Sequence, residues 1–284
     1  MTTTISTATT AGPLTPAFNG GLRGALADGW TITWRNLQRL RRSPDMILFA
    51  VLQPIMFVLL FSQVYGGSIH VAGTDYTDYM MAGIFGQTVV FGSTFSGSAM
   101  AQDLKEGIID RFRTLPMSPA GVLIGRTNAD LVLNSISMVI MMLTGFLVGW
   151  RFHNGVPSLL AGVGLLLMFS YAFSWVMSLL GMMVRTPETI NNAAFMVLFP
   201  LTFISNAFVQ PQNMPKVLEV VANWNPVSAL VHAARTLFGN IGSAPTPDTL
   251  PLQHSIVTVL VGSVVMLVIF VPLCVARFQN TSSR

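Results

Sequence analysis

The chain has 284 residues, of which 52% are hydrophobic and only 9% are charged. Soluble domains carry about 25% charged residues, so this composition excludes a water-soluble globule and favours a membrane protein. Its single cysteine, Cys274, allows neither an intrachain disulfide nor a cysteine metal site. The net charge of +4 is better explained by membrane topology than by binding to nucleic acid, because the basic residues cluster in particular loops.

The first 43 residues precede the first apolar stretch that is long enough to span a bilayer. Residues 1–20 are rich in Thr, Ala, Gly and Pro and are expected to form a disordered cytoplasmic tail. Residues 21–43 show helical periodicity, with apolar side chains on one face and arginines toward one end, which is typical of a helix in the membrane interface. A juxtamembrane helix without membrane contact is the alternative. The interfacial residues are predicted to be Trp30, Trp34, Arg35, Arg39, Arg41 and Arg42.

Residues 44–284 are predicted to form one all-α transmembrane domain. A spanning helix needs about 20 mostly apolar residues, and six stretches qualify without containing Asp, Glu, Lys or Arg. The second stretch is rich in Gly and Ser, so it is predicted to pack inside the bundle, where small residues let helices approach closely. The predicted spans are about 47–64, 80–100, 131–150, 159–184, 190–209 and 256–275.

The distribution of basic residues predicts the orientation. With the N-terminus inside, 12 of the 15 Lys and Arg residues fall in cytoplasmic segments, as the positive-inside rule requires. The outer segments then contain only Arg151, Lys216 and Arg235. Both termini are therefore predicted to be cytoplasmic. A five-span topology is disfavoured because it would put Arg277 and Arg284 outside.

The loop between the second and third spans, QDLKEGIIDRFRTLPMSPAGVLIGR, is predicted to contain a short amphipathic helix. Pro116 ends this helix, and Ser118 and Pro119 begin the next one. Such a helix can dock into a groove of a partner or pack on its own bundle, and the residues alone leave both open. Its apolar face is predicted to contain Leu104, Ile108, Phe112 and Leu115, surrounded by Glu106, Asp110, Arg111 and Arg113.

The longest external segment, residues 210–253, is predicted to form a helical hairpin below the outer surface. Asn225 and Pro226 are typical of an N-cap and a first helical position. The apolar stretch that follows them is too short to span, and residues 216–222 form its predicted partner helix. Backbone that re-enters a membrane must have its hydrogen bonds satisfied by protein. The hairpin residues singled out are Asn225, Pro226, His232 and Arg235.

Polar side chains within the apolar stretches are candidates for lining a pathway, namely Gln53, Asn134, Tyr171 and Asn206. At Gln53 a packing kink before Pro54 is favoured over a substrate contact. Asp130 lies four residues after Arg126, where an interfacial ion pair is favoured over a proton relay. The four histidines show no helical metal-ligand spacing, so no metal site is expected.

Three segments, taken together, resemble a known family. They are EGIIDRFRTLPMSP at 106–119, RTPETINNAAFMVLFPLTFISNAFV at 185–209 and NWNPVSALVHAAR at 223–235. With the arginine-bearing amphipathic start, their order and spacing resemble a permease subunit of the ABC type-2 exporter family, in particular its daunorubicin-resistance branch. The resemblance covers nearly the whole chain beyond the N-terminal tail, and none of its motifs is a catalytic signature.

The resemblance implies an assembly in which two permeases, identical or related, pair above two ATPase subunits. The helix around 106–115 would be the coupling helix in a cleft of the ATPase, the amphipathic start the connecting helix, and 210–240 a re-entrant hairpin that covers the pathway. The chain has no GxxxxGK[ST] loop, so it is expected to bind no cofactor and to have no enzymatic activity of its own. ATP and Mg²⁺ would be held by the partner subunit.

The predicted function is therefore the transmembrane subunit of an ABC exporter in the bacterial cytoplasmic membrane, with a homodimer favoured. It would contact membrane lipid and a small amphiphilic cargo, namely a drug, a secondary metabolite or a lipid, and no nucleic acid. Three alternatives stay open: a glycan or teichoic-acid export permease, an ion-coupled secondary transporter that uses Asp130, and a non-transporting scaffold or immunity protein.

Overall fold

The computed structural model describes residues 22–41, 44–66, 71, 73–109, 118–242 and 249–280. These residues are mainly helical and contain no strand, only an isolated bridge between Val71 and Thr74. The helices are α1 (Leu22–Arg41), α2 (Pro44–Tyr65), α3 (Tyr76–Gly92), α4 (Thr94–Lys105), α6 (Pro119–Val148), α7 (Gly155–Gly181), α8 (Pro187–Phe203), η1 (Pro211–Asn213), α9 (Lys216–Trp224), α10 (Pro226–Phe238), α11 (Leu250–Gln253) and α12 (Ser255–Asn280). The all-α fold class is therefore confirmed.

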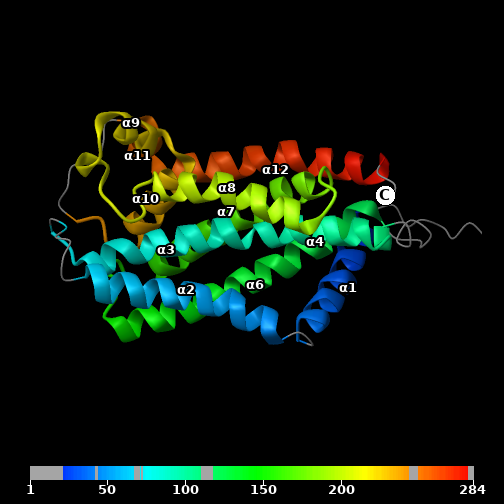
Figure 1. Cartoon of the computed structure of the whole chain (residues 1–284), viewed down its shortest axis with the longest axis horizontal. Helices are drawn as coiled ribbons and strands as arrows, with labels where there is room; N and C mark the ends of the chain where they lie inside the picture. The colour runs from blue at the N-terminus through cyan, green and yellow to red at the C-terminus, as the bar shows by residue number, and fades with distance from the viewer. Residues whose placement is uncertain are drawn as a thin grey trace, which may run out of the picture.

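The long helices form an elongated bundle, and most of them run along its long axis (Figure 1). One end carries α9, α10 and α11 and is called the hairpin end below (Figure 1). The opposite end carries α1, the end of α4 and the start of α6 (Figure 1). The hairpin therefore lies at the opposite end of the molecule from Lys105 and Pro119, where α4 ends and α6 begins.

Three helices in the described part of the chain are long and apolar enough to cross a membrane. They are Ala120–Val148, Gly155–Gly181 and Ser255–Gln279, and they correspond to the third, fourth and sixth predicted spans. The helices at the other predicted spans are shorter. Helix α2 contributes the apolar stretch Leu52–Val64, and α8 has 17 residues. The count of six crossings stays a prediction.

The predicted second span is divided into α3 and α4, which follow one another through the bundle (Figure 1). The two helices meet at Ser93, whose buried hydroxyl donates to the carbonyl of Val89 at 2.8 Å and to that of Ser170 at 3.1 Å. Thirteen of the 17 residues of α3 are buried. The prediction that this span packs inside the bundle is therefore confirmed, with a break that the sequence pattern did not indicate.

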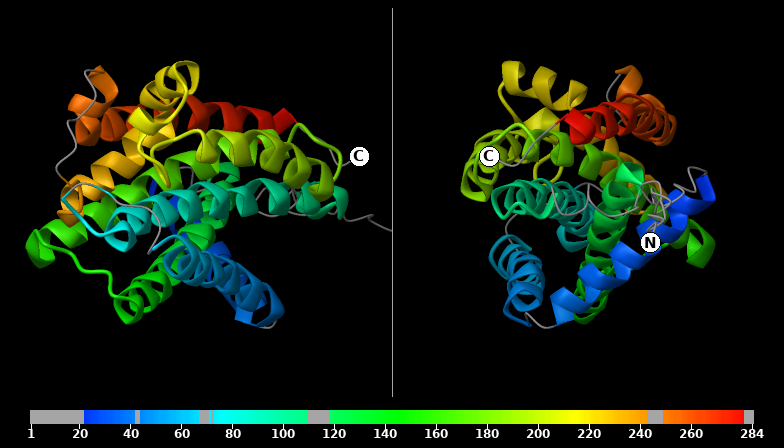
Figure 2. Two further views of the ribbon diagram at one scale, coloured as in Figure 1. Left: turned by 60° about the vertical axis from the view of Figure 1, so that its left-hand side comes forward. Right: turned by 90° about the vertical axis from the view of Figure 1, so that its right-hand side faces the viewer.

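Helix α1 is fastened to α6 through small residues. A β-carbon added at Gly125 would lie 2.6 Å from Cβ of Ile32, and one added at Gly29 would lie 3.0 Å from the Ile124 side chain. The hydroxyl of Thr33 donates to the carbonyls of Gly29 (2.7 Å) and Gly125 (3.2 Å). Glycine thus permits the close approach of the two helices, which lie against one another in Figure 2.

The exposed residues of α1 include two tryptophans. Trp30 is 68% exposed and Trp34 is 57% exposed, and the neighbouring Arg35 is also exposed. Arg39 and Arg41 belong to the same helix, whereas Arg42 lies outside the described residues. The structure therefore contains the helix that was predicted for residues 21–43, and its contact with a membrane stays a prediction.

Candidate functional site

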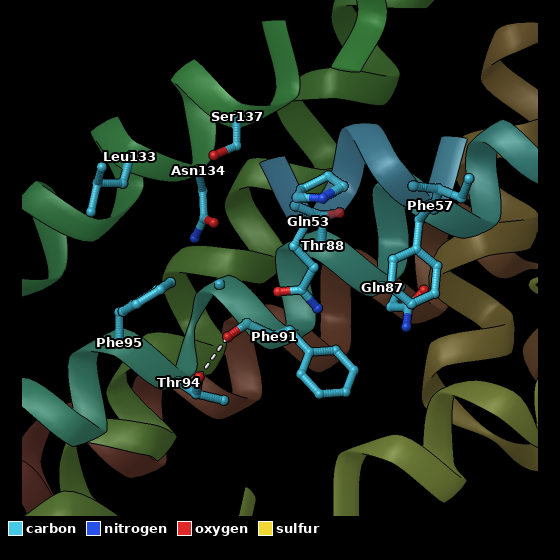
Figure 3. Close-up of a pocket in the computed structure, with 13 residues that line it drawn as sticks. Gln53, Phe57, Gln87, Thr88, Phe91, Thr94, Phe95, Leu133, Asn134 and Ser137 are labelled. Carbon is cyan, nitrogen blue, oxygen red and sulfur yellow. Dashed lines mark hydrogen bonds between the residues drawn. The ribbon is translucent and has the colours of Figure 1, made fainter. Parts of the chain in front are cut away.

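A pocket of about 380 Å³ lies between α2, α3, α4 and α6 (Figure 3). It is located where α3 meets α4, so Phe91 and Gly92 line it from one side of the break and Thr94 and Phe95 from the other. None of its lining residues is charged. Its polar lining consists of Gln53, Gln87, Thr88, Thr94, Asn134 and Ser137, and its aromatic lining of Phe57, Phe91 and Phe95.

Two of the four predicted pathway residues, Gln53 and Asn134, lie in this pocket. The Nδ2 of Asn134 donates to Ser170 Oγ at 2.7 Å, and Gly92 leaves room for the amide, because any β-carbon there would collide with Asn134 Oδ1. The other two residues lie elsewhere. Tyr171 packs edge-on against Trp175 with ring centroids 6.3 Å apart, and Asn206 belongs to the hairpin end.

Sequence reasoning did not single out Gln87, Ser137 or the three phenylalanines of the pocket. A signal for Gln87 was present, since it is the only amide in the predicted span 80–100. No comparable signal existed for the phenylalanines, because the chain contains 19 of them. Their role depends on which helix faces they share, and that is a property of the packing.

A row of aromatic rings runs from the pocket to the bend after α8 and back to the pocket. Adjacent ring centroids in this row are 4.3–6.2 Å apart, within or close to the range in which rings attract one another. Both ends of the row, Phe57 and Phe91, line the pocket. The members in order are Phe57, Phe61, Phe208, Phe203, Phe199, Phe195 and Phe91. The row draws its rings from α2, α3, α8 and the bend after α8.

Asn225 alone connects the two helices of the predicted hairpin, α9 and α10. Its Oδ1 accepts from Val227 N at 2.8 Å, which caps α10, and Pro226 occupies the first helical position as predicted. Its Nδ2 donates to the carbonyls of Leu201 (2.6 Å) and Ile204 (2.8 Å). The same side chain therefore starts α10 and satisfies carbonyls that α8 leaves open at its end.

Arg235 is the most deeply buried charged residue of the hairpin, with 2% of its surface exposed. Its guanidinium lies 3.6 Å from the ring centroid of Tyr79 and donates to the Tyr79 carbonyl at 3.0 and 3.2 Å. It also donates to the carbonyl of Asn206 at 3.0 Å. No described carboxylate forms an ion pair with it. Arg235 therefore holds α10 against α3 and the bend after α8 through carbonyl oxygens and a ring face.

His232 lies one turn before Arg235 on α10, with its Nδ1 3.2 Å from Ser255 Oγ. Burial, together with the nearby Arg235 charge, lowers the pKa of His232 to about 4. The imidazole is therefore neutral at pH 7. Among the described residues no group of three His, Cys, Asp or Glu side chains could hold a metal ion.

At the opposite end, the predicted amphipathic helix is interrupted. Helix α4 ends at Lys105, and Gly107 has a φ of +67°, a left-handed conformation that ends a helix. Leu104 therefore belongs to α4, and helical geometry resumes only at Ile108, so the prediction of one continuous face from Leu104 is wrong at its start. Leu104 is moreover buried within the chain. The remaining residues of that face, Asp110, Arg111, Phe112, Arg113 and Leu115, lie outside the described residues.

Polar contacts join α4 to α6 beside this loop. Arg126 Nη1 lies 3.5 Å from Asp103 Oδ2, and the hydroxyl of Ser96 donates to the Asp130 carboxylate. The sequence favoured an ion pair between Arg126 and Asp130. In the structure Arg126 instead forms its ion pair with Asp103 on the neighbouring helix α4. Asp130 is buried and takes a serine hydroxyl as its hydrogen-bond donor. Both ends of the loop are consequently fixed to one another.

Residues 28–239, well over half of the chain, match the family model of the ABC-2 type transporter. The chain therefore belongs to the ABC-2 type transporter family, and it is a membrane protein with the apolar helices that such a family requires.

Two relatives extend the match. The chain is 28% identical over 283 residues to the daunorubicin resistance ABC transporter permease protein DrrB1 of Streptomyces coeruleorubidus, covering 98% of this chain and 97% of that protein. It is 24% identical over 231 residues to the doxorubicin resistance ABC transporter permease protein DrrB of Mycobacterium tuberculosis, covering 81% and 80%. The resemblance to ABC permeases of the drug-resistance branch is thereby confirmed.

Proposed function

We propose that the chain is the transmembrane subunit of an ABC exporter that moves amphiphilic molecules out of the cell. The cargo class comprises drugs, secondary metabolites and lipids. The observation that carries the proposal is an uncharged pocket with amide and aromatic lining inside a chain of the ABC-2 type transporter family. Pockets that hold drug-sized molecules are mostly apolar and contain a few polar groups, as this one does.

The energy for transport comes from a separate subunit. The chain has no phosphate-binding loop, so two ATPase subunits with ATP and Mg²⁺ bind a homodimer of this permease. Residues 106–115 form the contact with the ATPase. The Asp103–Arg126 and Ser96–Asp130 contacts then pass a displacement of that loop to α4 and α6 together. The names of the two relatives, both ABC transporter permeases, support this division of labour.

The proposed location is the bacterial cytoplasmic membrane, with six crossings and both termini in the cytoplasm. The concentration of 12 of 15 basic residues in the segments assigned to the inside supports this orientation. The exposed Trp30 and Trp34 of α1 support a contact with lipid at the cytoplasmic surface, since tryptophan prefers the interface between water and hydrocarbon. The hairpin of α9 and α10 then lies at the outer surface as a re-entrant cover of the pathway.

Copurification tests the proposal directly. Purified from its native host, the chain should bring down a P-loop ATPase in equal amount, and the reconstituted complex should move an amphiphilic dye only when ATP is present. Replacing Glu106 or Arg113 by alanine should lower transport or ATPase assembly while the protein stays in the membrane. Lys216→Ala is the control, because Lys216 is exposed on α9 at the other end. A stable complex without any ATPase would refute the proposal.

The buried Asp130 supports a second candidate, an ion-coupled secondary transporter, because ionisable residues within membrane segments often serve ion pathways. The two candidates differ in their energy source. Transport that follows an imposed proton gradient without ATP, and that Asp130→Asn abolishes, would establish the second candidate. Transport that requires ATP and survives in Asp130→Asn would eliminate it.

A further inference from the structure

The pocket between α2, α3, α4 and α6 contains polar groups that the described protein leaves without a partner. Gln87 is 7% exposed and Ser137 is 6% exposed, and neither side chain hydrogen-bonds a described residue. Asn134 uses its Nδ2 for Ser170 and leaves its Oδ1 for the pocket. None of these polar atoms is both sealed from solvent and unpaired. All three are therefore accessible to a hydrogen-bonding molecule that enters the pocket.

The size of the pocket indicates more than one bound water. A volume of about 380 Å³ lies within the range of roughly 300–1,000 Å³ that is typical of small-molecule sites, whereas a water in liquid occupies about 30 Å³. Figure 3 shows Asn134 pointing from α6 into the space that Gln53 borders on α2. The rings of Phe57, Phe91 and Phe95 supply flat apolar walls beside these amides.

The lining also limits the charge of the occupant. A charged group within a membrane protein is costly unless an opposite charge pairs with it, and no lining residue is charged. Amide and hydroxyl groups can instead both donate and accept, which suits neutral polar groups.

We propose that the pocket binds the uncharged form of a flat aromatic amphiphile, with Gln87, Ser137 and Asn134 Oδ1 as its hydrogen-bond partners. This inference rests on the proposed function and names the cargo chemistry of that site. An exporter built in this way selects the neutral form of a titratable cargo, the form that also partitions best into a bilayer.

Two nearly isosteric dyes test the charge preference. Nile red is neutral and has a ring carbonyl, whereas Nile blue has almost the same ring system and a positive charge. Each is titrated against the full chain in lipid nanodiscs without ATP, and empty discs of the same lipid are subtracted. Nile red should bind about tenfold or more tightly than Nile blue. Equal binding of the two dyes would overturn the proposal.

Substitutions assign the binding to the pocket. Gln87→Met and Ser137→Ala should each weaken Nile red binding by roughly two- to twelvefold, the effect of one neutral hydrogen bond. Ser135→Ala is the matched control on α6, because that hydroxyl donates to the Leu131 carbonyl instead, and Gln63→Met is the exposed control on α2. If the pocket variants bind like the controls, the unpaired groups hold ordered water only and the proposal is wrong.

Gln87 offers two readouts that a purely structural role would not give. Gln87→Met should leave the thermal stability of the empty protein unchanged or raise it, because it removes no hydrogen bond to a described residue and puts an apolar side chain of similar size in place of the amide. Gln87→Glu should weaken Nile red binding and strengthen Nile blue binding. A destabilised Gln87→Met variant, or a Gln87→Glu variant with unchanged preference, would contradict the assignment. Because no ATP is involved, failure here leaves the ATPase partnership intact, and the absence of an ATPase leaves the dye result intact.

Discussion

Replacing Arg235 by lysine and, separately, by methionine tests whether this buried arginine acts through its shape or through its charge. The guanidinium lies over the Tyr79 ring at 3.6 Å and donates to the carbonyls of Tyr79 and Asn206 at 3.0–3.2 Å. Lysine keeps the charge but lacks the planar fork that reaches both carbonyls and stacks on the ring. Methionine keeps much of the volume and removes the charge.

The lysine variant should be the less stable of the two. It loses at least one charge-assisted hydrogen bond of about 1.5–3 kcal/mol and much of a buried cation–π contact of about 2 kcal/mol. Its ammonium still carries a desolvation cost of several kcal/mol. In the methionine variant that cost disappears, and the Asn206 carbonyl keeps its hydrogen bond from the Tyr79 hydroxyl at 3.0 Å. We therefore expect a loss of about 3–5 kcal/mol for Arg235→Lys and a smaller loss for Arg235→Met.

The assay is thermal unfolding of the protein in lipid nanodiscs, followed by the loss of monodisperse protein in size-exclusion chromatography. Tyr79→Phe serves as a companion variant, because it keeps the stacked ring and removes only the hydroxyl bond to Asn206, at a cost of about 1 kcal/mol. The reasoning is refuted if Arg235→Lys is as stable as the unmodified protein, or if Arg235→Met unfolds at a lower temperature than Arg235→Lys.

Of three further predictions, those for Gly83 and His232 use the same stability assay, and the one for Gly125 uses proteolysis. Gly83→Ala should lower the stability of the fold by about 1–3 kcal/mol, because the new β-carbon would lie 2.7 Å from the carbonyl carbon of Ala207. Gly262→Ala is the control and should leave the stability unchanged, because no atom lies within 4 Å of its β-carbon. Gly125→Val should detach α1 from α6, because even a β-carbon at residue 125 would lie 2.6 Å from Cβ of Ile32 on α1. The expected result is faster proteolysis of α1. The pKa of His232 lies near 4 in the folded chain and near 6.5 in the unfolded chain. The unfolded state therefore binds the proton first, and stability should fall by up to about 1.4 kcal/mol per unit as the pH drops from 6.5 toward 4, a slope absent in His232→Asn.

The features that could be predicted from the sequence are those with a local cause. Ser118 and Pro119 begin α6, and Asn225 and Pro226 begin α10, because an N-cap and a proline act within one helical turn. The burial of α3 could be predicted because glycine and serine leave room for neighbouring helices whatever those helices are. In each case the relevant interaction lies within a few residues or depends only on side-chain size.

The features that escaped prediction depend on distant partners. Tyr79 and Arg235 are separated by 156 positions, so nothing in either local sequence reveals their contact. Arg126 was expected to pair within its own helix, but Asp103 on α4 offers it a partner across the interface. The break at Gly107 escaped because the apolar periodicity continues through it, and only the φ of +67° shows that the helix ends there.

The position of the pocket at the junction of α3 and α4 follows from these distant contacts. Helix α4 is tied to α6 by the Ser96–Asp130 contact and the Asp103–Arg126 ion pair, whereas α3 is tied to α10 and to the bend after α8 through Tyr79. The two halves of the second predicted span therefore belong to different sets of polar contacts. They meet at Ser93, and the residues on both sides of it line the pocket. Because α3 and α4 both line the pocket, a displacement of α4 relative to α3 changes the shape of the pocket.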